Sequence, residues 1–364
     1  MEVSLLCARL SLSGPLHISS GREDPESSGE IFHSDTLTAA MVAAGLELFE
    51  DFHPGDFIDS FIPSSAFPWF RKELFFPKPM SLFPFTYAGS DADVNQNKKL
   101  KKLTYLGKSY FEKVLEGQEV EIPASHQLDK GVFLSDKVAQ EDILIQNRKT
   151  SIIGKELQQR VSLLNRTIEG DPRTFYLERV FFHPEGGIYI LFYNPTAENP
   201  SEFDEAFKKR LGTLLRYLGE KGLGKNRTFG FGQFDFKDFE TITIKVPENC
   251  THWMNFSLYC PKGKSSTDTE LNHDVLRDAS YQLIKRGGWL SDAENPRHLS
   301  LRKKSVYMFQ EGSVLNWGQK EKGIWGTGKL VDLRPSPGKK LKEFPLMNHP
   351  VWRDGRAIFF PIRQ

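Results

Sequence analysis

The sequence predicts an α+β protein of two domains. Its 364 residues suffice for two domains that each bury a core. Segments with the alternation of strands and segments with helical periodicity occur in both halves of the chain. Phenylalanine occurs 29 times against 10 tyrosines, so many phenyl rings are expected inside the protein. We expect the domains to comprise residues 1–238 and 239–364.

The first half is expected to open with a strand and a helix. Alternation predicts a strand from Val3 to Leu12, and a loop rich in glycine, serine and acids follows at 14–30. Ser34 or Asp35 can cap the helix that comes next. The predicted apolar side of this helix comprises Leu37, Met41, Leu46, Leu48 and Phe49.

The middle of the chain predicts edge strands, a polar insertion and a hairpin. Prolines and aromatic residues between 52 and 85 exclude a long helix and indicate irregular packing with edge strands. A polar excursion begins near Asp129, and a short helix is expected within it at 156–165. The segments 173–180 and 187–193 predict a hairpin that turns at the sequence PEGG.

The segment KGLGKNRTFGFG, residues 221–232, follows a predicted amphipathic helix from Phe203 to Leu218 and precedes an extended segment. Its four glycines permit positive φ angles, and successive N–H groups in such a turn form an anion-binding nest. Lys221, Lys225 and Arg227 add positive charge that phosphate oxygens accept. This composition favours a loop that holds a phosphate backbone; a solvated, inert turn is the alternative.

The same loop resembles a nucleotide-binding P-loop, but the match fails. Gly219, Gly224 and Lys225 fit the pattern G-x-x-x-x-G-K, yet Asn226 stands where Ser or Thr is required. A P-loop also follows a strand and precedes a helix, which is the reverse of the order here. No G-x-G-x-x-G follows a predicted strand, so a dinucleotide-binding fold has no support either.

The second half repeats the mixture of strands and a helix. Strands are predicted at 241–246, 253–260, 305–309 and 357–362, a helix at 274–286, and a second glycine cluster at 323–329. Strand, helix and strand closed by a hairpin therefore occur twice, which predicts two ferredoxin-like α+β domains joined near residue 238.

The net charge of only +1 excludes attraction of the whole molecule to nucleic acid. Any binding of nucleic acid therefore depends on local basic clusters. These clusters are the lysine run at 98–102, the group Arg148, Lys149 and Lys155, the glycine loop, and the group Arg302, Lys303 and Lys304. We expect the lysine run to be a solvated face.

The apolar runs and the cysteines point to a soluble cytoplasmic protein. No apolar run approaches the roughly 18 residues of a membrane helix, and the first residues lack the features of a signal peptide, so no membrane association is expected. Cys7, Cys250 and Cys260 form no C-x-x-C pair, which excludes a disulfide framework and a cysteine zinc site. Neither a metal nor a cofactor is expected.

Four segments share their order and spacing with one known family. They are PLHISSG with FHSDTLTAAM at 15–41, the stretch from NRKTSI to LERVFF at 147–182, GLGKNRTFGFGQF at 222–234, and GKLVDLRP with HPVWRDGRAIFFPI at 328–362. Together they resemble the RAMP superfamily of CRISPR-associated proteins, and most closely the fourth subunit of the type III-A Csm effector complex. The resemblance spans nearly the whole chain.

The resemblance implies a non-catalytic, RNA-binding scaffold for antiviral defence. It implies two ferredoxin-like domains of the RNA-recognition (RRM) type, with an inserted thumb at about 129–173. The implied partners are the 5′ handle of the crRNA, the large polymerase-like CRISPR subunit and the backbone subunits. By position, the implied RNA-binding residues are His33, Ser34, Asp35, Asn147, Arg148, Lys149, Asn165, Arg166, Thr167, Gly222, Gly224, Lys225, Asn226, Arg227, Thr228, Gly230 and Gly232.

The implied site also includes the opening of the first helix and the phenylalanines of the glycine loop. The opening of the first helix, His33 to Asp35, would turn free N–H groups towards the RNA. Phe229 and Phe231 would either stack on bases or pack inwards, and the sequence leaves both open.

Two other functions remain as alternatives. Related RAMP proteins cleave RNA with a histidine that acts as general acid or base, and His17 and His33 are the candidates here. No cluster of histidines and carboxylates has the spacing of metal ligands, so a metal nuclease is not expected. A protein-only adaptor, in which the glycine loops are merely turns, would have no affinity for RNA. Lys225 and Arg227 would face bulk solvent in the adaptor and the groove between the two sheets in an RNA-binding protein.

Overall fold

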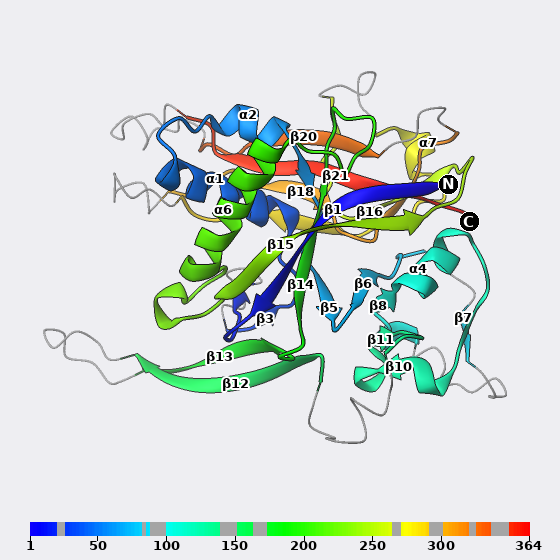
Figure 1. Ribbon diagram of the computed structural model, residues 1–364, viewed down its shortest axis with the longest axis horizontal. Coiled ribbons are helices and arrows are strands. Elements are labelled where there is room, and N and C mark those ends of the chain that lie inside the picture. The colour runs from blue at the N-terminus through cyan, green and yellow to red at the C-terminus, as the bar shows by residue number, and fades with distance from the viewer. Residues whose placement is uncertain are drawn as a thin grey trace, which may run out of the picture.

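The chain folds around one large and one smaller β-sheet (Figure 1). The computed structural model describes residues 1–19, 26–81, 85–87, 100–138, 151–162, 173–263, 271–290, 301–319, 325–335 and 349–364. The large sheet has the order β10-β11-β8-β6-β5-β14-β1-β15, and β4 pairs with β14 beside this path. The smaller sheet has the order β19-β16-β21-β20.

The strands of the large sheet are β1 (Glu2–Leu12), β4 (Ile62–Pro63), β5 (Phe67–Phe70), β6 (Glu73–Pro77), β8 (Tyr105–Gly107), β10 (Gln127–Leu128), β11 (Phe133–Leu134), β14 (Gly186–Tyr193) and β15 (Phe234–Lys245). The strands of the smaller sheet are β16 (His252–Asn255), β19 (Val314–Asn316), β20 (Gly326–Asp332) and β21 (Trp352–Ile362). The two-stranded pairs are β2 (Ile18–Ser19) with β3 (Ser28–Gly29), β7 (Phe85–Tyr87) with β9 (Val120–Ile122), β12 (Ile153–Ser162) with β13 (Arg173–Phe182), and β17 (Leu283–Arg286) with β18 (Val306–Phe309).

The described helices are α1 (Ser34–Leu48), α2 (Pro54–Asp59), α4 (Lys108–Leu115), α6 (Glu205–Lys221) and α7 (His273–Leu276), with short 3-10 turns η1 (Ala124–His126), η2 (Asp129–Gly131) and η3 (Arg227–Phe229). No described helix is both long and apolar enough to span a membrane.

The N-terminal half contains a β-α-β-β-α-β unit. Its neighbouring strands β15, β1, β14 and β5 are antiparallel, α1 follows β1, and α6 connects β14 to β15. This succession of elements is that of a ferredoxin-like unit. Helix α6 begins at Asp204, whose carboxylate accepts the N–H of Phe207, and its leucines face the sheet. Each fully buried leucine contributes about 1.5–3 kcal/mol by leaving water.

The C-terminal half does not confirm the second ferredoxin-like domain. The helix predicted at 274–286 is wrong: helix α7 ends at Leu276, and Leu283 to Arg286 form strand β17. The described residues of this half therefore place a four-stranded sheet and the β17–β18 ribbon beside one short helix. Pairing of β17 with β18 outweighs the helical pattern of the sequence.

The polar excursion also differs from the prediction. The helix expected at 156–165 is wrong, because Ile153 to Ser162 form β12, which pairs with β13 along its whole length. The hairpin expected at 173–193 is wrong as well. A turn does close between His183 and Gly186, but β13 pairs with β12, whereas β14 pairs with β1 and β5.

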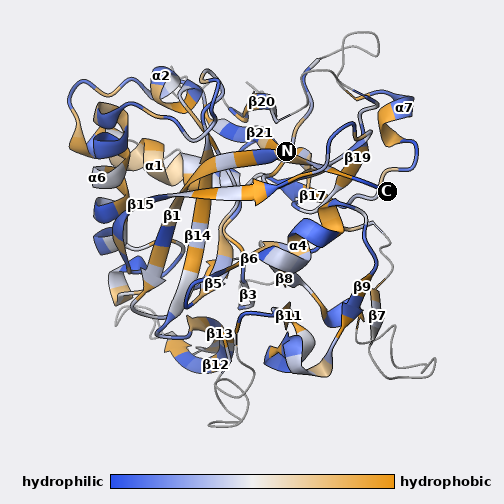
Figure 2. Cartoon of the chain, turned by 45° about the vertical axis from the view of Figure 1, so that its right-hand side comes forward, coloured by the Kyte–Doolittle hydropathy of each residue, from blue (hydrophilic) through white to orange (hydrophobic). Residues whose placement is uncertain are grey.

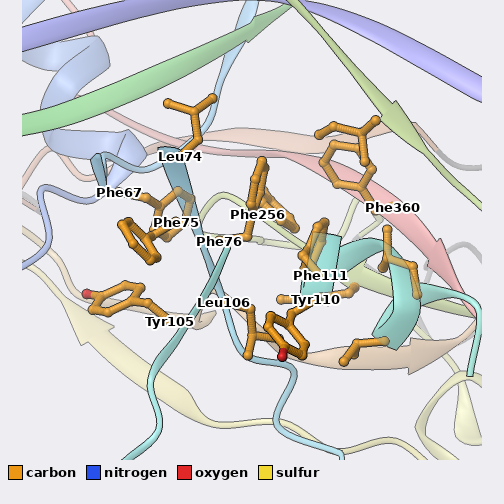
Figure 3. Packing of buried hydrophobic residues seen from close by; sticks show 14 of the residues in the cluster. Phe67, Leu74, Phe75, Phe76, Tyr105, Leu106, Tyr110, Phe111, Phe256 and Phe360 are labelled. Atoms are coloured by element: carbon orange, nitrogen blue, oxygen red, sulfur yellow. The ribbon is translucent and has the colours of Figure 1, made fainter. Parts of the chain in front are cut away.

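The interior is rich in phenylalanine, as expected. Phe76 stacks on Phe111 with ring centroids 4.6 Å apart, and Phe256 packs against both rings and against Phe360 (Figure 3). These rings come from both halves of the chain, so one core joins the two sheets. In Figure 2 the hydrophobic colour follows β14, which is buried over nearly its whole length.

The predicted domain boundary near residue 238 falls inside β15. The pairing of β15 with β1 continues to the pair of Glu2 with Lys245. Residues 239–245 are therefore part of the large sheet.

Candidate nucleic-acid interface

The glycine loop, residues 221–232, is held in one conformation by the segment that follows β1. The N–H of Lys225 donates to the carbonyl of His17 at 3.0 Å, and the N–H of Gly232 donates to the carbonyl of Pro15 at 2.8 Å. Leu16, between these two acceptors, exchanges hydrogen bonds with Val180 of β13. The loop is thus the outer of three adjacent segments, with residues 15–17 in the middle and the β12–β13 hairpin beneath.

Glycine is required at several positions of this loop. Gly222, Gly224, Gly230 and Gly232 all have positive φ, between 70° and 88°. A Cβ at Gly232 would overlap the carbonyl oxygen of Leu223, and a Cβ at Gly224 would lie 2.6 Å from the carbonyl oxygen of His17. The close approach of neighbouring backbone therefore excludes larger residues at these positions.

Polar groups of the loop point outwards. Lys225, Arg227 and Thr228 are exposed, and neither cation forms an ion pair with a described residue. Within the described part of the chain, the N–H groups of Gly224, Asn226, Arg227 and Thr228 donate to no protein acceptor. Asn226 adopts the left-handed conformation with φ of 59°. Three consecutive N–H groups without a protein acceptor, those of Asn226, Arg227 and Thr228, therefore lie beside two exposed cations, an arrangement suited to an anion.

The two phenylalanines of the loop, for which the sequence left both orientations open, have opposite environments. Phe229 is 71% exposed, whereas Phe231 is only 3% exposed. The guanidinium of Arg160 lies 5.4 Å from the centroid of each ring. Arg160 belongs to β12, so the hairpin reaches the loop and presents a cation beside the exposed ring.

The β12–β13 hairpin carries further exposed apolar side chains. Leu157 is 63% exposed and Val161 is 52% exposed on β12, while Tyr176 is 44% exposed on β13. The register places Gln159 opposite Tyr176, so all three apolar side chains lie on one face of the ribbon. Figure 1 shows this hairpin extending along the lower edge of the molecule, away from the two main sheets.

Sequence reasoning missed Arg160 because it assigned this segment to a helix. The apolar residues Ile153, Leu157 and Val161 recur every four positions, which is a helical spacing, so the local sequence carried no signal for the ribbon.

Six predicted RNA-binding residues lie outside the described residues: Asn147, Arg148, Lys149, Asn165, Arg166 and Thr167. The described remainder of the predicted thumb consists of η2, β11, β12 and the start of β13. In the lysine run, Lys101 and Lys102 are exposed, in agreement with a solvated face.

His17 is a buried residue of the loop's support. Its side chain is 1% exposed, and Nδ1–H donates to the carbonyl of Glu178 at 2.8 Å. Nε2 is buried and has no partner among the described residues. His17 therefore lies beneath the glycine loop and does not reach its outer surface.

The opening of α1 faces the C-terminal half and not solvent. His33 is the N-cap, so the prediction that Ser34 or Asp35 caps the helix is wrong. Ser34 and Asp35 are buried, and the N–H of Ser34 donates to Oγ of Ser65 at 2.9 Å. The expected free N–H is thus satisfied inside the protein at Ser34. On the predicted apolar side, Leu37 and Met41 are buried, but Leu46 and Leu48 are exposed.

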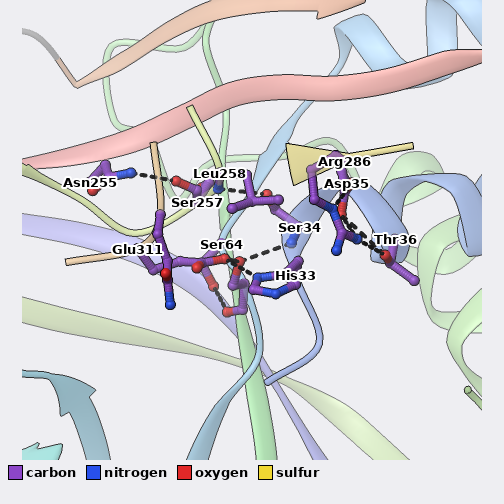
Figure 4. A network of polar contacts seen from close by, with 12 residues as sticks. His33, Ser34, Asp35, Thr36, Ser64, Asn255, Ser257, Leu258, Arg286 and Glu311 are labelled. Carbon is purple, nitrogen blue, oxygen red and sulfur yellow. Dashed lines mark hydrogen bonds and ion pairs between the residues drawn. The ribbon is translucent and has the colours of Figure 1, made fainter. Parts of the chain in front are cut away.

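A network of buried polar groups joins this helix to the C-terminal half (Figure 4). Nδ1 of His33 contacts the carboxylate of Glu311 at 2.8 Å, and Ser65 donates a short hydrogen bond to the same oxygen. The N–H of Leu258 donates to Oγ of Ser34 at 3.0 Å. Each of these contacts crosses from one half of the chain to the other, so they fix the relative position of the two sheets.

Asp35 is the charged centre of the same network. Arg286 approaches its carboxylate through two nitrogens at 2.8 and 2.9 Å, and Arg353 approaches at 3.3 Å. Burial alone would raise the pKa of Asp35, but the two guanidinium groups outweigh burial and lower it. Asp35 is therefore a buried structural anion that a ligand cannot reach in this structure.

We expect the contact between His33 and Glu311 to make stability depend on pH. Burial alone would lower the pKa of His33, but the Glu311 carboxylate outweighs it and raises the pKa. The contribution of a histidine with a raised pKa is complete below its unfolded value of about 6.5 and is lost as pH rises through the folded value. The thermal midpoint of the wild type should therefore fall between about pH 6 and pH 9 by more than that of His33→Gln. Equal slopes in the two proteins would contradict this assignment.

The three cysteines are free and buried, and no group of three metal-ligating side chains occurs among the described residues.

Comparison with known proteins gives consistent matches to one family. Residues 248–362 match the family model of the CRISPR Csm4 C-terminal domain. The chain is Csm4-like. It is 23% identical over 297 residues to the CRISPR system Cms protein Csm4 of Thermococcus onnurineus strain NA1, covering 78% of this chain and 84% of the relative. It is also 23% identical over 378 residues to the protein of the same name from Methanocaldococcus jannaschii, covering 94% and 93%.

Solved structures of Csm4 share the fold of this Csm4-like chain. The Csm3–Csm4 subcomplex of the type III-A CRISPR-Cas interference complex contains a chain that matches with a TM-score of 0.58 at 16% identity, covering 100% of both chains. A Csm1–Csm4 cassette in complex with cA4 matches with a TM-score of 0.56 at 17% identity, covering 99% of this chain and 98% of the other. The resemblance predicted from the sequence is confirmed.

Proposed function

We propose that this chain is a non-catalytic, RNA-binding subunit of a type III-A CRISPR effector complex, located in the cytoplasm, that holds the 5′ handle of the crRNA. The observation that carries the proposal is the outer surface of the glycine loop. There, unpaired N–H groups, two exposed cations and the exposed ring of Phe229 lie together. Exposure of Lys225 and Arg227 by itself is also what the protein-only adaptor predicts, so the unpaired N–H groups and the ring beside these cations are what favour RNA. Backbone N–H groups, point charges and an aromatic face are the means by which proteins bind single-stranded RNA.

The proposed binding surface continues from the loop to the β12–β13 hairpin. Arg160 connects the two by its contacts with Phe229 and Phe231. The exposed face with Leu157, Val161 and Tyr176 would act as the thumb, where apolar side chains contact an unstacked nucleotide.

The proposed protein partners follow from the assemblies of the relatives. Solved structures of similar fold come from a Csm1–Csm4 cassette and a Csm3–Csm4 subcomplex. We therefore propose that this chain docks a large polymerase-like subunit and a backbone subunit of its own complex.

We also propose that the chain has no nuclease activity of its own. Both histidines named as nuclease candidates are engaged elsewhere: His17 is buried and bonded to Glu178, and His33 contacts Glu311. Neither side chain belongs to the outer surface of the loop. RNA bound by this chain should therefore stay intact.

The test is binding of the purified chain, alone and with its large partner subunit, to labelled crRNA with or without the 5′ handle, followed by a gel of the RNA. Handle-dependent binding with intact RNA is expected. Cleavage that disappears in His17→Ala would establish the nuclease instead, and equal failure to bind either RNA would favour the protein-only adaptor.

Removing both cations of the loop should weaken handle binding. If Lys225 and Arg227 each make a charge-assisted hydrogen bond, the double alanine variant loses about 1–3 kcal/mol, or roughly 5- to 150-fold in Kd. Lys209→Ala is the matched control, since Lys209 is exposed on the neighbouring helix α6. Unchanged affinity in the double variant would mean that the loop does not contact the handle.

A further inference from the structure

The β17–β18 ribbon presents an aromatic face to solvent on the C-terminal half. Tyr281 is 42% exposed, Leu283 is 47% exposed and Tyr307 is 60% exposed. The register pairs Lys285 with Tyr307 and Leu283 with Phe309, so these side chains share one face. Nζ of Lys285 lies 6.0 Å from the centroid of the Tyr307 ring. A cation and an exposed ring are therefore adjacent on the surface.

The described segments of this ribbon carry charge of one sign; the connecting residues 291–300, which include Asp292 and Glu294, lie outside them. The described segments 281–290 and 301–309 contain five cations and no carboxylate. The cations are Lys285, Arg286, Arg302, Lys303 and Lys304. Of these five cations, only Arg286 lies within ion-pair distance of the carboxylate of a described residue, that of Asp35. The ribbon thus carries positive charge that the described protein does not neutralise.

The edge of the ribbon that faces α1 also carries more positive than negative charge. Arg286 and Arg353 share the single carboxylate of Asp35. Partial burial, together with repulsion from Arg353, lowers the pKa of Lys303 to about 8, although Asp35 opposes the shift. Three cations are thus coupled to one buried carboxylate, and Lys303, which is partly exposed, is the one whose charge an anion at the surface would stabilise.

The ribbon and the glycine loop are connected through the opening of α1. The ring of Phe32 packs against Gly224 of the loop, and Asp35, three residues later, binds Arg286 of β17. Three residues of extended chain span at most about 11 Å. The glycine loop and the β17–β18 ribbon therefore contact opposite ends of the short segment from Phe32 to Asp35.

We propose that the β17–β18 ribbon is a second contact surface for single-stranded RNA, in which Tyr307 stacks on a base while Lys285 and Lys303 contact phosphates. Aromatic rings interleaved with lysines, with no carboxylate in the described segments, are the chemistry of single-strand binding and not of an acidic protein partner, which offers no base to stack. The proposal extends the proposed function, since it assigns RNA to a surface separate from the handle-binding loop.

The test uses the full-length chain and a labelled oligouridine of about 20 nucleotides, which lacks the handle sequence. In the variant with Lys285→Ala and Tyr307→Ala, the Kd should rise about tenfold, since loss of one stacking contact has an effect of that order. The slope of log K against log salt should become smaller by about 0.7, because one phosphate contact is lost. Tyr307→Phe keeps the ring and should bind almost as the wild type does, and Lys209→Ala should change neither quantity.

The outcomes separate this surface from the loop. If the ribbon variant loses affinity and the variant with Lys225 and Arg227 replaced does not, the ribbon binds RNA although the handle assignment fails. An unchanged Kd and salt slope in the ribbon variant would overturn the proposal, whatever the loop variant does. Competition by polyglutamate as effective as that by unlabelled RNA would also overturn it, in favour of an acidic protein partner.

Discussion

Replacing Gly232 by alanine should lower the free energy of unfolding by about 2–5 kcal/mol, because the left-handed backbone and the overlap of the new Cβ each destabilise the loop. Gly232 has a φ of 70°, and its Cβ would overlap the carbonyl oxygen of Leu223. The N–H of Leu223 also donates to the carbonyl of Gly232, so the two strands of the loop cannot separate without losing this hydrogen bond. Urea unfolding of the purified variant measures the change.

Gly230→Ala is the matched control for this prediction. Gly230 has a φ of 78°, but the nearest atom to its Cβ is Oε1 of Gln233 at 3.6 Å. Only the left-handed backbone conformation then disfavours alanine, and it should lower the free energy of unfolding by about 1–2 kcal/mol. Equal destabilisation by the two substitutions would show that close backbone approach does not maintain the loop. If handle binding is lost in Gly232→Ala and retained in Gly230→Ala, the loop conformation and not merely its glycine content supports binding.

Replacing Asp35 by alanine should destabilise the protein by about 3–5 kcal/mol, because it leaves buried positive charge without a partner. Arg286 and Arg353 have side chains that are 19% and 15% exposed, and both depend on this carboxylate. These ion pairs join Asp35 in the N-terminal half to two arginines in the C-terminal half. Their loss should therefore loosen the packing of both halves together. Urea unfolding is again the measurement, followed by two independent probes, one in each half.

The control for Asp35 is an ion pair at the surface. Asp51 is 83% exposed and contacts Arg210 at 3.0 Å. Asp51→Ala should change stability by about 0–1 kcal/mol, as surface pairs do. Because the pKa of Asp35 is lowered, its contribution is present above the unfolded value of about 3.9 and is lost as pH falls through the folded value. The acid branch of the stability curve should therefore be flatter in Asp35→Ala, and an unchanged branch would contradict the assigned role.

Local sequence features predicted the glycine loop and the elements beside it. Helix α6, its end before Gly222 and the positive φ angles of the four glycines follow from helical periodicity and from the freedom of glycine. Strand β1 and the helix after it were also placed correctly. These features depend on residues that are neighbours in sequence.

Features that depend on distant segments were not predictable in this way. Residues 153–162 and 283–286 contain helix-forming side chains, and they become strands because β13 and β18 offer partners for pairing. Phe229 and Phe231 are two residues apart and equally apolar, yet Phe229 is exposed and Phe231 is buried, because remote segments of the chain cover only the second ring.

The sequence alone determined the composition of the RNA-binding loop, the order of helix, loop and strand around it, and the family to which these motifs point. Tertiary structure decided that the opening of α1 is buried against Glu311 and Arg286, and that the ribbon of Tyr307 and Lys285 faces solvent. The reason is physical. Conformational preference acts between neighbouring residues, whereas burial, ion pairing and strand pairing depend on which remote segments the folded chain brings together.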